Sequence, residues 1–452
     1  MYFGLKGILP VPAVVWVMTL FLLNQAMALG HDYRALTLDD CLALAREQNP
    51  VLSASREKVQ ELVADYQAAR SKFFPRLVLV SYYDRQPPNR FSSGGALTNF
   101  ELFKREGLTS VTGKQIIFDG LKTHYNTKAA KIGAQAQQEE VQRTTAEVAF
   151  AVTEAFFRLI EAKENLQVAQ EALRQRQEFA KLTNAFFQAG KITHLDSFRA
   201  QSQVSEAEQA VVEADNAVRL AKEILARTMG LNEPAPVDVK GQLPREFAAA
   251  AAVNSLWQET LKTNPELKRL SLEIEQSQTL VKAARGAYLP EVSLQAGSDV
   301  RHRDLGGTKP EWIAGVFMEY PFFEGGLTRA QVAKVNSQNL QLLEKKRDRL
   351  NGIKVDLTTA WKDQENARQG VVTTRQTIAT NEEAYASADA LYRHGKAIGL
   401  DVLQAQVDLT SSRFTYIKYA VAYEIGRARI RQIVGSDPTP SYQPSNNGGQ
   451  KP

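Results

Sequence analysis

The side chains that most often carry out chemistry are sparse in this chain. Its 452 residues include one cysteine, Cys41, and five histidines that are isolated from one another. The sequence contains no Walker glycine–lysine loop, no H-E-x-x-H pair and no G-x-S-x-G elbow, which are motifs of nucleotide binding and hydrolysis. One cysteine makes neither an intramolecular disulfide nor a cysteine metal cluster. We therefore expect no catalytic residue, no metal site and no cofactor.

Two aspartates occupy matching positions in the sequence. Asp196 lies six residues after Gly190, and Asp401 lies six residues after Gly395. An aspartate in the first turn of a helix stabilises the helix N-terminus by about 0.3–1 kcal/mol, because its charge opposes the positive end of the helix dipole. This local role fits both aspartates.

The aspartates belong to a tandem duplication. Four short motifs recur 205 positions apart: Phe118-Asp119-Gly120 and Phe323-Glu324-Gly325, Gly190-Lys191 and Gly395-Lys396, Leu195-Asp196 and Leu400-Asp401, and Met229-Gly230 and Val434-Gly435. Upstream, Asn49-Pro50 and Asn264-Pro265 are 215 positions apart, so the first copy contains ten extra residues. A duplication of this length predicts two equivalent structural units, as in rings with internal pseudo-symmetry.

The two ends of the chain differ from the repeats. Residues 1–28 combine a positive start, a short apolar run and an Ala-Met-Ala site, which is the pattern of a secretory signal peptide; a retained N-terminal anchor helix is the alternative. We divide the rest into a first repeat (29–240), a second repeat (241–435) and a tail rich in Pro, Asn and Gly (436–452), which we expect to be disordered.

Charge and hydropathy restrict the function classes. The net charge of +5 is spread along the predicted helices and forms no basic arm, which gives no support to nucleic-acid binding. After residue 28, no apolar run approaches the roughly 20 residues that a membrane-spanning helix needs. If the mature chain enters a membrane, it does so through strands.

The helical segments are long and have the same order in both repeats. The first repeat opens with a helix from Thr37 to Phe74, whose start resembles a capping box, and Ser255-Leu256-Trp257-Gln258 is expected to open the second repeat in the same way. Pro50 and Pro265 are expected to interrupt or kink these helices.

A much longer helix follows in each repeat, over 121–189 and 327–394, each on the order of 100 Å. The chain then turns at Gly190 or Gly395, and a shorter helix with a heptad pattern of medium and small residues returns beside the long one. This pattern predicts antiparallel helical rods. A generic coiled-coil pair would share the rods, but it would not account for the strands.

Strand periodicity precedes each long helix. Apolar and polar residues alternate over about 291–301 and 311–321, and the first copy has matching segments at about 76–86 and 108–118. Strands of about 9 to 11 residues can cross a bilayer, but the same alternation also fits a soluble sheet. A barrel with a lumen needs about eight strands, so membrane insertion of four would require several copies of the chain.

Together these features resemble the TolC-type outer-membrane efflux proteins. The resemblance rests on the repeated order of elements, the Phe-Asp-Gly or Phe-Glu-Gly-Gly step from strand to helix, and a Gly followed five or six residues later by Leu-Asp, over Thr37 to Gly435. It implies a mainly α fold with a transmembrane β-barrel: a homotrimer with a 12-stranded barrel, two β-hairpins per chain, and a periplasmic tunnel of helical hairpins.

The resemblance also implies a function and partners. The protein would be a passive conduit in the bacterial outer membrane, in contact with lipid, for efflux or type I secretion. A periplasmic adaptor (membrane fusion) protein would connect it to an inner-membrane pump or ABC transporter, which supplies the energy. The sequence does not identify the cargo.

Site residues follow from the resemblance. The helical tips would dock the adaptor through Gly190, Lys191, Ile192, Gly395, Lys396 and Ala397, although these residues could also serve only the turn. Asp401 and Gln404 would lie at the entrance constriction, and Asp196 and Tyr392 would form a tip latch. Gln404 replaces a second ring carboxylate and Ala397 replaces a latch arginine, which puts gating by a double acidic ring in doubt.

Aromatic residues near the strand ends could form a girdle at the membrane interface or pack beneath a loop: Tyr82, Tyr83, Trp312, Tyr320, Phe322 and Phe323. Two other classes of protein stay open. A periplasmic coiled-coil structural or adaptor protein without a pore would be soluble or only peripherally attached, and an enzyme on a helical scaffold would need a catalytic cluster that the sequence does not show.

Overall fold

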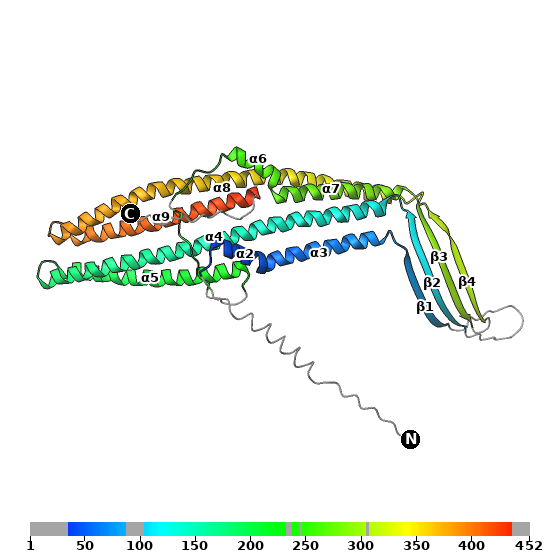
Figure 1. Cartoon of the computed structure of the whole chain (residues 1–452), viewed down its shortest axis with the longest axis horizontal. Helices are drawn as coiled ribbons and strands as arrows, with labels where there is room; N and C mark the ends of the chain where they lie inside the picture. The colour runs from blue at the N-terminus through cyan, green and yellow to red at the C-terminus, as the bar shows by residue number, and fades with distance from the viewer. Residues whose placement is uncertain (1–34, 87–103, 232–236, 245, 304–306, 436–452) are drawn as a thin grey trace, which may run out of the picture. The chain divides into compact units, whose positions relative to one another are not determined.

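The computed structural model describes residues 35–86, 104–231, 237–244, 246–303 and 307–435 (Figure 1). The expected signal peptide and the expected disordered tail lie outside these residues. In chain order the elements are α2 (Leu38–Gln48), α3 (Pro50–Ser71), β1 (Arg76–Gln86), β2 (Lys104–Phe118), α4 (Lys122–Gln188), α5 (His194–Met229), α6 (Val253–Thr263), α7 (Pro265–Arg285), the short 3₁₀ helix η1 (Gly286–Tyr288), β3 (Glu291–Arg303), β4 (Gly307–Glu319), α8 (Leu327–Arg393) and α9 (Gly399–Val434).

The opening helix of each repeat is interrupted at its proline. The side-chain oxygen of Asn49 accepts hydrogen bonds from two backbone N–H groups of α3, and that of Asn264 accepts one from α7, the Leu267 N–H. Pro50 and Pro265 are the first residues of these helices, where a missing N–H has little effect. The predicted interruption is confirmed, and each opening segment consists of two helices.

The two repeats begin their first helices differently. Thr37 and Asp40 form the expected reciprocal cap, with the Asp40 carboxylate 2.9 Å from the Thr37 nitrogen and 2.7 Å from its hydroxyl. The same prediction for Ser255 is wrong. Helix α6 begins at Val253 with no side-chain cap, and the Ser255 hydroxyl donates back to the Ala252 carbonyl at 2.7 Å. Ser255 lies inside the first turn, where serine bonds a preceding carbonyl instead of a free N–H.

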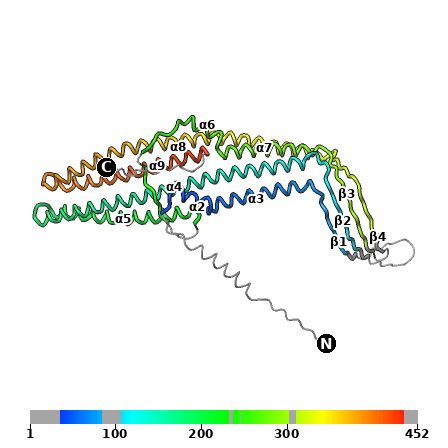
Figure 2. Tube along the Cα trace, in the orientation of Figure 1, coloured from blue at the N-terminus to red at the C-terminus, as the bar shows by residue number. Residues whose placement is uncertain are grey.

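Two long helices dominate the described chain. Helices α4 and α8 have 67 residues each, and α5 and α9 have 36 each. Figure 2 shows α5 beside α4 and α9 beside α8, each pair joined at a tight turn. Arg176 of α4 donates to the Gln203 carbonyl of α5 at 3.2 Å, and Arg413 of α9 pairs with Glu382 of α8 at 2.9 Å. Among the described residues, no helix is both long enough and apolar enough to cross a membrane.

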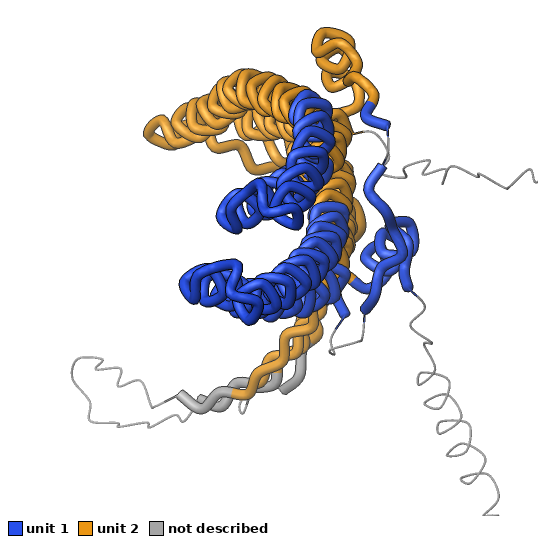
Figure 3. The backbone as a smooth tube through the Cα atoms, turned by 90° about the vertical axis from the view of Figure 1, so that its left-hand side faces the viewer, with its two compact units in different colours: residues 1–48, 151–247, 369–421 blue, residues 49–150, 248–368, 422–452 orange. Residues whose placement is uncertain are grey.

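The chain forms two compact units, which Figure 3 colours separately. The first unit contains residues 1–48, 151–247 and 369–421, and the second contains residues 49–150, 248–368 and 422–452. Each unit takes residues from both repeats because α4, α8 and α9 continue from one unit into the other. The boundary between the repeats at residue 240 is a division by sequence and stays a prediction.

The strands belong to the second unit and form one antiparallel sheet in the order β1-β2-β3-β4. The β2–β3 pairing joins the strands of the two repeats, so β1 and β4 are the edges of this sheet. Strand β4 begins at Gly307, before the expected start at 311, and it includes Pro310 opposite Val300. Proline is tolerated on an edge strand, where its missing N–H leaves the ladder intact.

The register gives the sheet one apolar face and one mixed face, which is mostly polar on β2 and β3 but carries Val78 and Val80 of β1 and Ile313 and Phe317 of β4. The apolar face carries Leu77 and Leu79 of β1, Val111 of β2, Leu294 and Ala296 of β3, and Trp312 and Val316 of β4. On the other face, the Ser110 hydroxyl donates to the Asp299 carboxylate at 2.6 Å, and Lys114 pairs with Glu291 at 3.0 Å. Trp312 is 82% exposed, so the described residues leave the apolar face largely uncovered.

The step from β2 to α4 explains the Phe-Asp-Gly motif. The Asp119 carboxylate caps α4 by accepting the Thr123 N–H at 2.8 Å and the Thr123 hydroxyl at 2.6 Å. Gly120 has a φ of +69°, and a Cβ there would lie 2.1 Å from the carbonyl oxygen of Gly286. Only glycine fits this close approach of two backbones.

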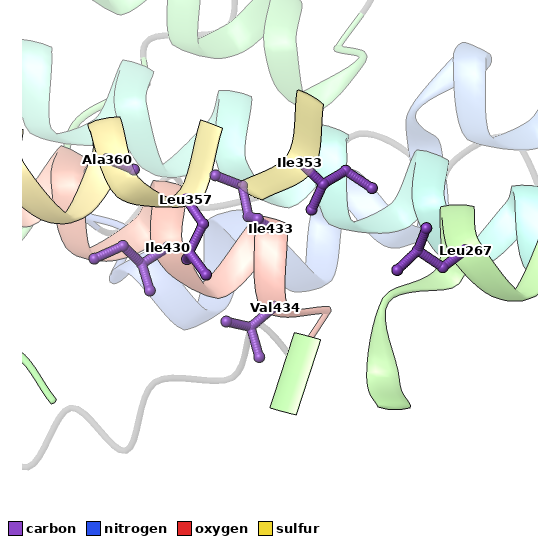
Figure 4. Close-up of a cluster of buried hydrophobic side chains, with 7 residues drawn as sticks. All are labelled: Leu267, Ile353, Leu357, Ala360, Ile430, Ile433 and Val434. Carbon is purple, nitrogen blue, oxygen red and sulfur yellow. The ribbon is translucent and has the colours of Figure 1, made fainter. Parts of the chain in front are cut away.

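A hydrophobic core lies in the second unit where α7, α8 and α9 meet (Figure 4). It contains Leu267, Ile353, Leu357, Ala360, Ile430, Ile433 and Val434. The Asn264 amide donates to the Ile433 carbonyl at 2.7 Å, so the residue that caps α7 also fixes the end of α9. Burial of these aliphatic side chains holds the helices of the second repeat together.

Candidate functional site

The first helical tip is a tight turn between α4 and α5. After α4 ends at Gln188, the Gly190 N–H donates to the Phe187 carbonyl at 2.8 Å and the Lys191 N–H donates to the Phe186 carbonyl at 2.9 Å. Gly190 has a φ of +69°, the left-handed conformation that ends a helix in this motif. The turn-forming role expected for Gly190 is therefore present in the structure.

The second tip repeats this turn between α8 and α9. The Gly395 N–H donates to the Tyr392 carbonyl and the Lys396 N–H to the Leu391 carbonyl, both at 2.9 Å, and Gly395 also has a φ of +69°. The duplication thus reaches the level of individual backbone hydrogen bonds. The two tips differ in their side chains.

The return helices start with different caps. At α5, the Thr193 hydroxyl donates to the Asp196 carboxylate at 2.8 Å and accepts the Asp196 N–H at 3.4 Å. At α9, Ile398 stands at the position of Thr193, and only its N–H donates to the Asp401 carboxylate, at 3.3 Å. Both aspartates thus have the local capping role that their position predicts.

An aromatic cluster joins the two hairpins within the first unit. Tyr392 is 4% exposed, and its ring centroid lies 5.1 Å from that of Phe179 and 5.6 Å from that of Phe186. Ala200 of α5 and Val402 of α9 complete the buried core. Burial raises the pKa of the Tyr392 phenol; its hydroxyl lies close to the Thr183 hydroxyl but makes no well-formed hydrogen bond in the described structure, and Thr183 donates to the Phe179 carbonyl at 2.7 Å. The cluster is therefore held by apolar packing.

The predicted latch residues Asp196 and Tyr392 lie near each other, and no hydrogen bond joins them in the described structure. Burial is the main cause of the raised pKa of Tyr392, and the negative charge of Asp196 raises it further, so the carboxylate lies within electrostatic range. The Asp196 carboxylate itself accepts the Thr193 hydroxyl. The latch stays a prediction.

The predicted docking residues divide by exposure. Gly190, Lys191, Gly395 and Lys396 are exposed, and Ile192 and Ala397 are half-buried. The Lys191 ammonium lies 5.4 Å from the centroid of the Phe186 ring. Ala397 packs against the Tyr392 cluster, so an apolar contact occupies the position of the expected arginine.

A groove of about 300 Å³ lies between α8 and α9 beside the second tip. Its walls are formed by Asn381, Ala384, Ala388, Asp401, Gln404, Ala405 and Asp408. The predicted constriction residues Asp401 and Gln404 are therefore brought together on one helix face.

Asp408 is the charged groove residue that the sequence prediction missed. It accepts the Gln404 amide at 2.9 Å on its carboxylate and the Asn381 amide at 3.0 Å on its backbone carbonyl. The signal was the spacing of Asp401, Gln404 and Asp408, since residues three, four and seven apart share a helix face. In the described part of the chain, no three His, Cys, Asp or Glu side chains are arranged to hold a metal ion.

The six aromatic residues of the predicted girdle are all exposed: Tyr82, Tyr83, Trp312, Tyr320, Phe322 and Phe323. Because β4 begins at Gly307, Trp312 lies in the middle of that strand and not at its end. None of the six is buried by the described residues. Exposed aromatic side chains at the ends of apolar strands are typical of a membrane interface.

Comparison with protein families identifies the chain. The family described as "Outer membrane efflux protein" matches residues 41–231 and 256–436, one segment in each repeat. This chain belongs to that family. It is an outer-membrane channel component of an efflux system, with its helical tunnel in the periplasm.

Relatives and solved structures agree along the length of this efflux protein. Outer membrane efflux protein BepC of Brucella suis biovar 1 is 23% identical over 432 residues, which are 91% of this chain and 90% of BepC. The Campylobacter jejuni CmeC outer membrane channel has a TM-score of 0.78 at 16% identity, over 88% of this chain and 85% of CmeC. The transmembrane channel CusC has a TM-score of 0.77 at 18% identity, over 88% of this chain and 91% of CusC.

The predicted family, the mainly helical fold and the outer-membrane location are confirmed. Members of the family are channel proteins that form trimers and work with adaptor and inner-membrane pump partners. The similarity does not identify the partners of this chain.

Proposed function

We propose that three copies of this efflux protein form one passive conduit across the outer membrane, in which their sheets close a single 12-stranded barrel. The two-faced, four-stranded sheet is the observation that supports this proposal. Its apolar face suits lipid, and the polar side chains that β2 and β3 carry on the other face suit a water-filled lumen. Open sheet edges do not occur in lipid because unpaired backbone groups cost several kcal/mol each, so β1 of one copy pairs with β4 of the next.

The helical tips are the proposed docking site for a periplasmic adaptor. Lys191 and Lys396 are exposed there, on turns made rigid by the hydrogen bonds around Gly190 and Gly395, and Ile192 and Ala397 complete the two loops. An inner-membrane pump or ABC transporter supplies the energy, and the conduit itself catalyses no reaction. Both efflux and type I secretion are compatible with such a conduit.

The acidic residues of the second tip are the proposed entrance constriction. Three copies of Asp401 around one axis attract cations and repel one another, and Asp408 adds a second carboxylate one turn beyond Gln404. Tyr392 is the proposed closure residue, through its ring packing against Phe179 and Phe186. Asp196 acts on this cluster only through its charge.

The mass of the intact complex tests the conduit. The protein is extracted from purified outer membranes in mild detergent, and the unheated complex is weighed by light scattering. We expect an integral assembly of three chains. A monomer or dimer released by salt or alkaline wash would contradict the proposal and would favour a pore-free periplasmic coiled-coil protein.

A further inference from the structure

Within the first unit, the two hairpins meet through two different sides. Side A, on the first hairpin, is formed by Phe179, Thr183 and Ala200; side B, on the second hairpin, is formed by Tyr392, Gly399 and Leu403. The Phe179 and Tyr392 ring centroids are 5.1 Å apart. A Cβ added to Gly399 would lie 3.5 Å from the Phe179 ring, in ordinary van der Waals contact, so Gly399 faces this ring directly.

The duplication places an equivalent side A on the second hairpin. The residues 205 positions after Phe179, Thr183 and Ala200 are Ala384, Ala388 and Ala405. All three line the groove of about 300 Å³ between α8 and α9, and Ala388 also packs against the cluster around Tyr392. The groove exists because alanine replaces a phenylalanine and a threonine that are buried in the first hairpin.

The duplication also places an equivalent side B on the first hairpin. The residues 205 positions before Tyr392, Gly399 and Leu403 are Phe187, His194 and Phe198. Their rings form an edge-to-face stack, with the His194 centroid 4.7 Å from that of Phe187 and 4.1 Å from that of Phe198. Phe198 is 64% exposed, so the described chain leaves much of this stack uncovered.

The two uncovered sides complement each other in bulk. In the contact within the chain, the large Phe179 faces the small Gly399. In the uncovered pair, the small Ala384 corresponds to Phe179 and the large His194 corresponds to Gly399. In the uncovered pair, the large side chains therefore belong to side B and the small ones to side A, the reverse of the contact within the chain. Such a reversal lets two surfaces pack together without leaving a cavity.

We propose that the Phe187, His194 and Phe198 stack of one copy inserts into the alanine groove of a second copy. This inference rests on the proposed trimer and assigns its contacts at the tips. Around the tunnel axis, two kinds of interface of the same geometry then alternate. Phe179 contacts Tyr392 inside each chain, and Ala384 contacts Phe187 between chains. Six contacts between a side A and a side B then surround the tunnel entrance, three within chains and three between chains.

Cross-linking of engineered cysteines tests this assignment in the full-length protein in outer membranes. Phe187→Cys combined with Ala384→Cys is treated with a bismaleimide that has a short spacer. Ala185→Cys combined with Ala384→Cys is the matched control, because residue 185 is exposed and lies about 200° around α4 from residue 187. Burial raises the pKa of the native Cys41 thiol to about 12, so Cys41 does not compete for the reagent.

We expect cross-linked dimers and trimers from the first pair and little product from the control pair. A three-chain assembly in which both pairs react equally, or neither reacts, overturns this inference and leaves the proposed conduit standing. Absence of a three-chain assembly overturns the proposed conduit as well.

A bulk exchange provides a second test. Ala384→Phe fills the groove and is expected to lower the temperature at which the trimer dissociates in detergent. Addition of His194→Gly recreates the pair formed by Phe179 and Gly399 and is expected to restore that temperature. If Ala384→Phe has no effect, or if His194→Gly deepens the loss, the side A to side B contact between copies is wrong.

Discussion

At the scale of single residues, two glycines with the same backbone angle predict different effects of one methyl group. Gly120 and Gly190 both have a φ of +69°. At Gly190 a Cβ meets no atom within 4 Å, so Gly190→Ala costs only the left-handed strain of about 1–2 kcal/mol. At Gly120 a Cβ would lie 2.1 Å from the Gly286 carbonyl oxygen, so the backbone must move.

We therefore expect Gly120→Ala to lower the midpoint of thermal unfolding much further than Gly190→Ala, measured by circular dichroism in detergent. Equal shifts would mean that the close approach of Gly120 to Gly286 does not hold the sheet against the helices.

Two substitutions of Tyr392 separate the contribution of its ring to stability from that of its hydroxyl. The hydroxyl is buried beside that of Thr183 and makes no well-formed hydrogen bond in the described structure, so Tyr392→Phe is expected to leave stability nearly unchanged. Tyr392→Ala removes a fully packed ring and is expected to cost about 3–5 kcal/mol. Thermal unfolding and single-channel conductance measure both effects. A Tyr392→Phe variant that conducts like Tyr392→Ala would favour the polar latch with Asp196 over the aromatic cluster.

At the scale of elements, the cap of α5 in the first repeat can be compared directly with the cap of α9 in the second. At α5, Thr193 and Asp196 form a cap through two hydrogen bonds of the Thr193 hydroxyl. At α9, Ile398 has no hydroxyl, and only its N–H donates to the Asp401 carboxylate. Ile398 is 64% exposed, so replacing it sacrifices little apolar burial. Ile398→Thr is expected to stabilise the protein by about 0.5–2 kcal/mol, and Thr193→Ile to destabilise it by a similar amount. Chemical denaturation followed by helical circular dichroism decides; a destabilising Ile398→Thr would refute the comparison.

The elements were predictable where local chemistry decides them. Prolines at 50 and 265 set helix starts, and the glycines at 190 and 395 set helix ends, because φ and hydrogen-bond capacity belong to single residues. Ser255 was misplaced because the same serine can cap a helix or bond back within it.

The candidate site was less predictable because it depends on contacts between distant segments. Asp401 and Gln404 could be named from the resemblance to the efflux-protein family, but the groove also depends on Ala384 and Ala388, which carry no sequence signal and come from another helix. The cluster around Tyr392 likewise joins residues more than 200 positions apart. Only comparison of the two copies shows that these alanines replace bulky residues.

At the scale of the whole molecule, the two repeats are combined in one sheet. Strands β2 and β3 come from different repeats and pair along most of their length, so one chain contributes a continuous four-stranded segment with β1 and β4 at its edges. For contact of the proposed barrel with lipid, continuity of the apolar face across all four strands matters more than the hydrophobicity of any single strand.

Adjacent residues of β3 provide the test of this two-faced sheet. Leu294 lies on the apolar face and Gln295 on the mixed face, paired with Val316 and Gly315 of β4. Leu294→Lys places a charge against lipid and is expected to cost about 2–4 kcal/mol at the middle of the bilayer. Gln295→Lys points into the lumen and is expected to leave assembly intact. The yield of heat-resistant trimer in purified outer membranes measures both. If the two variants assemble equally well, the faces are wrongly assigned, and if only Gln295→Lys fails, they are reversed.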